Sequence, residues 1–95
     1  MQLAETESPA RWEGVIADLT RRAATYDNEV TELTQHRDAL TLDAELGQDG
    51  AARQLQKLRE QIASKSGAAA SVRTAIQQAQ GRLDAARKAE AAEAG

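Results

Sequence analysis

The chain has 95 residues, enough for one small domain, with a formal net charge of −3 and an isoelectric point near 5.1. Cysteine is absent, which excludes disulfides, thiolate metal sites and cysteine nucleophiles. Aromatic residues make up 2% of the chain, and the acidic balance argues against direct nucleic-acid binding, which usually needs a basic face.

Residues 1–8 are predicted to form a flexible N-terminal tail, because Met1 to Glu7 are polar and show no helical period. This stretch has neither the basic nor the apolar segment of a signal peptide. No apolar run approaches the roughly 20 residues that a bilayer-spanning helix needs. We therefore expect no membrane span and a cytoplasmic or virion-associated protein.

A long helix is predicted over residues 9–46. Ser8 is a good N-cap, and Pro9 suits the first helical position because its missing N–H would be unpaired anyway. Apolar residues then recur every three or four positions for more than four heptads, which is typical of a coiled coil. The positions of this seam are Trp12, Ile16, Leu19, Ala23, Tyr26, Val30, Leu33, Arg37, Leu40 and Ala44.

A tight turn is predicted at residues 47–50, where the only cluster of helix breakers lies between two helical patterns. Gly47 is the residue type that ends a helix in the left-handed conformation. Asp49 can accept hydrogen bonds from the free amides of the next helix. A stop signal followed so closely by a start signal predicts a helical hairpin.

The second helix is predicted over residues 50–90, with residues 91–95 as a frayed C-terminus. Ser64, Ser66 and Gly67 are poor helix formers, and a break there would give three helices. The apolar period passes through Gly67 without a change of phase, so we expect a continuous or mildly kinked helix. Its seam positions are Leu55, Leu58, Ile62, Lys65, Ala69, Val72, Ile76, Ala79, Leu83 and Ala86.

The predicted fold is an all-α, antiparallel two-helix coiled-coil hairpin. Its favoured register places large seam residues opposite small or medium ones. A register centred near Ala51 would instead set Arg37 against Lys65, two like charges. Because alanine-rich layers bury little apolar area, we expect the hairpin to self-associate into a four-helix bundle or to dock on a larger assembly. The favoured register pairs Leu40 with Leu55, Leu33 with Ile62, Tyr26 with Ala69, Ala23 with Val72, Leu19 with Ile76, Ile16 with Ala79 and Trp12 with Leu83.

Catalytic chemistry finds little support in this sequence. The single histidine, His36, lies one helical turn from Glu32, and an acid–base or metal site needs more partners than that. The predicted fold has no strand, so no glycine-rich phosphate loop can follow one. We therefore expect no enzyme activity, no metal, no cofactor and no small-molecule substrate.

Two parts of the chain are candidate partner-binding surfaces. Leu42 and Leu46 lie outside the seam, with Ala39 on the same ridge, and could dock a partner or a second hairpin. A local contact between Leu46 and the start of the second helix is an equally open alternative. Trp12, at the other end of the first helix, is the second candidate contact.

Arg37 and Lys65 are the two charged residues of the seam. In one account, their aliphatic stems cover the seam while the charged ends reach water. In the other, they set the register or the choice of partner, as single polar seam residues can. Both accounts stay open at this stage.

The turn region, Ala39 to Leu55, reads Ala-Leu-Thr-Leu-Asp-Ala-Glu-Leu-Gly-Gln-Asp-Gly-Ala-Ala-Arg-Gln-Leu. It resembles the turn of small helical-hairpin proteins of tailed phages and prophages, whose pattern is Ala-Leu-x-Leu-Asp-Ala-x-Leu-Gly-Asp followed by an alanine-rich helix. Here Gln48 precedes Asp49, so the cap is shifted by one residue. The resemblance implies a virion or assembly component.

Two functions are therefore carried forward. The first is a non-catalytic structural or assembly protein that acts through coiled-coil contacts with other proteins or with itself. The alternative is a small regulatory binder that inhibits or adapts an enzyme complex. A many-copy particle component would favour the first, and a one-to-one soluble complex would favour the second.

Overall fold

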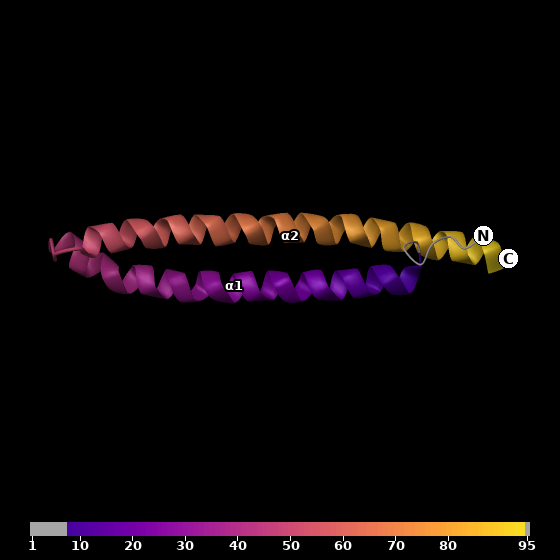
Figure 1. Cartoon of the computed structure of the whole chain (residues 1–95), viewed down its shortest axis with the longest axis horizontal. Helices are drawn as coiled ribbons and strands as arrows, with labels where there is room; N and C mark the ends of the chain where they lie inside the picture. Colours follow the sequence, from indigo (N-terminus) through magenta and orange to yellow (C-terminus); the bar gives the residue numbers. More distant parts are fainter. Residues whose placement is uncertain (1–7, 95) are drawn as a thin grey trace. The chain divides into compact units, whose positions relative to one another are not determined.

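A computed structural model describes residues 8–94 of the chain, and these form an all-α helical hairpin (Figure 1). Helix α1 runs over Pro9–Glu45 and helix α2 over Ala51–Ala94. Residues 1–7 of the predicted tail and Gly95 lie outside the described residues. The chain divides into a terminal unit, made of α1 up to Ala23 and α2 from Ser71 on, and a turn unit, Ala24–Ala70.

The start of α1 is capped by Ser8, as the sequence predicts. The backbone N–H of Arg11 donates to Ser8 Oγ at 3.2 Å. The N–H of Trp12 donates to the Ser8 carbonyl at 3.4 Å. The Ser8 side chain thus satisfies the Arg11 amide, which has no carbonyl partner within the helix, while the Ser8 carbonyl accepts the first helical hydrogen bond. Pro9 follows in a position that needs no donor.

The end of α1 is a Schellman motif built on Gly47. The N–H of Gly47 donates to the Ala44 carbonyl at 3.1 Å, and the N–H of Gln48 donates to the Asp43 carbonyl at 3.0 Å. Gly47 has a φ of 74°, the left-handed conformation that glycine adopts without steric cost. The predicted stop at Gly47 is confirmed.

The start of α2 differs from the prediction that Asp49 would cap it. Gly50 has a φ of 78°, and its carbonyl accepts the N–H of Gln54 at 3.0 Å. The N–H of Ala51 donates to the Gln48 carbonyl at 3.1 Å, which makes Gln48–Ala51 a type II turn with glycine third. Asp49 occupies the second position of this turn, one residue too early to cap. Gly50 is therefore the N-cap.

Helix α2 is continuous through Ser64 to Gly67, so residues 8–94 form two helices rather than three. Helix α2 extends to Ala94, beyond the predicted helix end at residue 90. Ala91, Ala92 and Glu93 are exposed and contribute no buried side chain. The high helix propensity of alanine and glutamate continues the helix past the last seam residue.

The turn unit packs in the favoured register. Lys65 lies opposite Glu29, with 2.6 Å between Nζ and Oε2, and its Nζ lies 5.7 Å from the centroid of the Tyr26 ring. These contacts fit a pairing of Tyr26 with Ala69, whereas the alternative would bring Lys65 to Arg37. Ala69 is the most deeply buried seam residue, at 1% exposure, at the position that the register pairs with Tyr26.

The terminal unit follows the same register. The Arg82 guanidinium lies 5.5 Å from the centroid of the Trp12 ring, next to Leu83, which the register pairs with Trp12. A hollow lined by Ser8, Pro9, Ala86 and other residues confirms that the start of α1 faces this part of α2.

Every predicted seam position of both helices is buried or half-buried. The buried set is small in volume, however, because it contains alanines and leucines and no larger side chain. No side chain larger than alanine is less than 2% exposed among the described residues. The seam therefore excludes water only partly, as its alanine content predicts. The buried residues are Ala51, at the start of α2, and the seam residues Ala23, Leu55, Leu58, Ala69, Ala79, Leu83 and Ala86.

Candidate interaction surface

A ridge of apolar side chains lies on the outer face of α1 near the turn. Leu42 and Leu46 are 65% and 68% exposed, and Ala39 is exposed beside them. Spacings of three and four residues place all three on one helix face, away from the seam residues Leu40 and Ala44. Leu46 keeps 68% of its surface exposed, so a local contact with the start of α2 would leave most of this side chain in water. We call Ala39, Leu42 and Leu46 the leucine ridge.

The leucine ridge is flanked by carboxylates. Residues 38–50 contain Asp38, Asp43, Glu45 and Asp49 and no lysine or arginine. Asp38 is held by the preceding Arg37, whose Nε and Nη2 lie 3.3 and 3.2 Å from Asp38 Oδ1. The other three carboxylates form no ion pair within residues 8–94. This end of α1 therefore presents apolar side chains in a negative field.

A polar hollow of about 640 Å³ lies along the helix pair in the turn unit. Its lining from α1 includes Glu29, Glu32 and His36, and its lining from α2 includes Gln61 and Lys65. Glu32 takes part in no ion pair in the described part of the chain, whereas Glu29 is bound to Lys65. The hollow thus offers one unpaired carboxylate beside a neutralised pair.

The Glu29–Lys65 pair is a side-chain ion pair that joins the two helices. The hydrogen bond that the Lys65 ammonium donates to Glu29, followed by the negative charge of Glu29, raises the pKa of Lys65 above the ordinary value of 10.5. Burial opposes this shift, and Tyr26 adds to it. Both side chains keep more than a third of their surface exposed, so solvent screens the pair.

Arg37 and Lys65 behave differently, although both are seam residues. The Arg37 guanidinium bonds to its sequence neighbour Asp38, so its contact lies within one helix. Lys65 crosses to Glu29 and Tyr26 of the opposite helix. Of these two residues, Lys65 is the one whose contact crosses to the opposite helix and so depends on the register of the hairpin.

Trp12 belongs to the terminal unit, whereas the leucine ridge belongs to the turn unit. Its half-buried ring lies between two guanidinium groups, at 5.6 Å from Arg11 and 5.5 Å from Arg82. Such distances are typical of cation–π contacts. Trp12 Nε1 is buried and has no hydrogen-bond partner among the described residues. The Trp12 ring therefore packs against side chains of its own chain and is only partly available to a binding partner.

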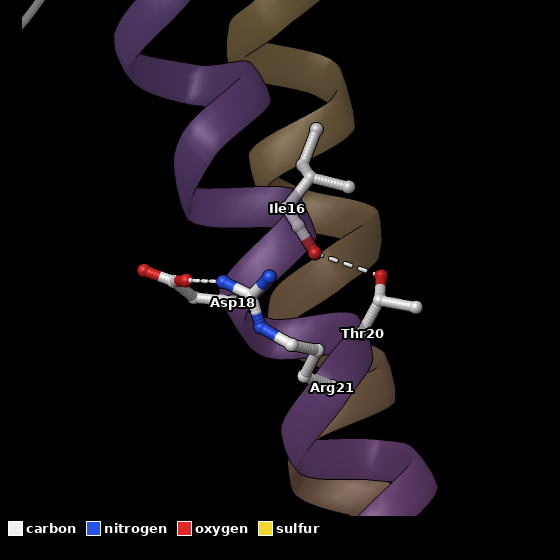
Figure 2. A network of polar contacts seen from close by, with 4 residues as sticks. All are labelled: Ile16, Asp18, Thr20 and Arg21. Atoms are coloured by element: carbon white, nitrogen blue, oxygen red, sulfur yellow. Dashed lines mark hydrogen bonds and ion pairs between the residues drawn. The ribbon is translucent and has the colours of Figure 1, made fainter.

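Polar side chains elsewhere on the outer face of α1 are satisfied within the helix. Figure 2 shows Thr20 Oγ1 donating to the Ile16 carbonyl, at 2.7 Å, and the Arg21 guanidinium paired with Asp18. Thr31 and Thr41 make the same bond to the carbonyl four residues earlier, at 3.0 and 2.9 Å. These hydrogen bonds each lie within one or two turns of α1 and do not bring the polar side chains together into a binding site.

Within residues 8–94, no group of three or more histidine, aspartate or glutamate side chains is placed to hold a metal ion. The same residues contain no helix that is long and apolar enough to cross a membrane. Comparisons with protein-family models, curated proteins and solved structures found no match. The link to phage proteins rests on the turn sequence alone.

Sequence reasoning missed the inter-helix pair and the hollow beside it. The signal was present in the favoured register, which places Lys65 opposite Val30 and hence beside Glu29. A seam lysine with an acid as its neighbour across the interface predicts an ion pair. The unpaired Glu32, one turn further along α1, follows from the same alignment.

Proposed function

We propose that this chain is a non-catalytic structural or assembly protein that acts through coiled-coil contacts with another protein. The observation that carries the proposal is the exposure of Leu42 and Leu46, at 65% and 68%. Every seam residue is buried or half-buried, whereas these two large apolar side chains are exposed to solvent. Neighbouring exposed leucines on one helix face are the usual mark of a protein-binding surface.

The thin seam supports the same proposal. Five of the eight buried residues are alanines, which contribute little apolar area each. A small hairpin of this kind gains stability when a partner covers more of its apolar surface. The turn sequence adds the expectation of a phage particle or its assembly as the setting.

Affinity capture with the full chain, followed by cross-linking mass spectrometry, tests the proposal. The variant Leu42→Gln/Leu46→Gln removes the apolar surface while keeping good helix formers, and Gln78→Ala is a matched change at another exposed position. We expect cross-links from the leucine ridge to a many-copy assembly protein, lost in the double variant and kept in Gln78→Ala.

Two results would contradict this assignment. A one-to-one soluble complex with an enzyme, cross-linked at the leucine ridge, would favour the regulatory binder instead. Cross-links that are unchanged in the double variant would show that the contact surface lies elsewhere.

A further inference from the structure

The leucine ridge continues into the polar hollow along one stripe of α1. Positions 32, 35, 39, 42 and 46 are separated by three or four residues, so they lie on one face of the helix. Glu32 and Gln35 both line the hollow, and all five residues are exposed. We call Glu32, Gln35, Ala39, Leu42 and Leu46 the outer stripe. The exposed leucines and the hollow are thus two parts of one surface within the turn unit.

The length of the outer stripe fits a helix. From Glu32 to Leu46 it spans about 21 Å at the helical rise, which equals about four turns. An amphipathic helix laid along such a stripe places apolar anchors at spacings of three and four residues. Its apolar anchors would meet Leu42 and Leu46, and its other end would lie over the hollow.

The charges of the outer stripe select the chemistry of the partner. Four acids, Glu32, Asp38, Asp43 and Glu45, lie on or beside it, and the single base between them, Arg37, is held by Asp38. Complementary charge at the rim steers association and penalises like-charged partners. A second copy docked on the same stripe would bring carboxylate to carboxylate, so self-association through this face is disfavoured.

We propose that the outer stripe binds an amphipathic helix of another protein whose leucine-like anchors are flanked by lysine or arginine. This inference rests on the proposed function and deepens it by naming the partner's chemistry. The anchors pack on Leu42 and Leu46, and a basic side chain enters the hollow to meet Glu32. Lys65 does not compete there, because Glu29 already binds it.

The test uses the full chain as bait for a yeast-displayed library of alanine-based helical peptides, each about four turns long. Apolar positions on one face are leucine or alanine, and flanking positions are lysine, glutamine or glutamate. We expect enrichment of peptides that combine leucine anchors with lysine flanks. Their binding should fall about tenfold or more on Leu42→Gln/Leu46→Gln and stay unchanged on Gln78→Ala.

A second bait separates charge from apolar contact. Glu32→Gln/Glu45→Gln keeps the helix and the leucines while removing two carboxylates, so the preference for lysine over glutamate should shrink severalfold. Stripe-dependent binders with glutamate or glutamine flanks would overturn the inference and leave the proposed function standing. Enriched peptides that bind the Leu42→Gln/Leu46→Gln bait as tightly as the natural chain would also overturn this inference. The affinity-capture experiment tests the proposed function independently of that result.

Discussion

Lys65 Nζ lies 2.6 Å from Glu29 Oε2, so a lysine in the seam of α2 is bound by a carboxylate of α1. The same ammonium lies 5.7 Å from the Tyr26 ring, which adds a cation–π contact from the same helix. A charge at a seam position normally costs stability, and here two groups of the opposite helix offset that cost. The contact exists only in the observed register.

Raising the pH should remove this contact. The pKa of Lys65 is raised in the folded chain above 10.5, so the stabilisation is fully present below pH 10.5 and is lost as the pH rises through the folded-state pKa. We expect the difference in unfolding free energy between the natural chain and Glu29→Gln to be constant from neutral pH to about 10 and to shrink above it. Urea titrations followed by circular dichroism measure it. A constant difference up to pH 12 would contradict the assignment.

Truncating a seam leucine should cost much more stability than truncating a leucine of the leucine ridge. Leu55 is 7% exposed, so Leu55→Ala should lower the unfolding free energy by about 2 kcal/mol or more. Leu42 is 65% exposed, so Leu42→Ala should change it by less than about 0.5 kcal/mol. Thermal and urea unfolding of the two matched variants test this. Equal losses would mean that Leu42 is buried in solution, for example in an oligomer.

Gly67 should be a site where alanine stabilises the chain. It lies inside α2, and a Cβ added there meets nothing within 4 Å. Gly67→Ala should raise the unfolding free energy by about 1 kcal/mol, the difference in helix propensity between the two residues. Urea unfolding measures the gain. Gly14→Ala and Gly81→Ala, which are equally open, serve as parallel cases.

Gly47 should respond in the opposite sense. Its surroundings are also open within 4 Å, but its φ of 74° is one that residues with a Cβ rarely adopt. Gly47→Ala should therefore lower the unfolding free energy by about 1 kcal/mol. The comparison with Gly67→Ala isolates backbone conformation, because neither substitution creates a clash. A gain in stability at Gly47 would show that the Schellman motif does not form in solution.

The fold could be predicted because the apolar period is long and the breakers are few. Every seam position from Trp12 to Ala86 is withdrawn from water, including the stretch around Gly67. The choice between the two registers was predictable as well, since the one centred near Ala51 would set Lys65 against Arg37. Such patterns report burial, which follows directly from hydrophobicity.

The cap of α2 and the end of α2 could not be predicted as well. Gly47 and Gly50 both adopt positive φ, and this moves Asp49 out of the capping position. Composition alone does not show that the turn uses both glycines in this way. Beyond Ala86, helix propensity without burial sustains the helix to Ala94. The hollow beside Glu32 depends on side-chain reach across the seam, which a heptad pattern does not describe.

The two left-handed glycines of the turn have a consequence for how molecules can exchange parts. If residues 46–50 were helical, the chain could straighten into a single rod and fill its seam with the rod of another molecule. Such domain swapping is a known hazard of altered hinge segments. Positive φ at both Gly47 and Gly50 opposes that rod, because the left-handed backbone interrupts a right-handed helix at two points. The turn therefore favours closure of each chain upon itself over intertwining with a neighbour.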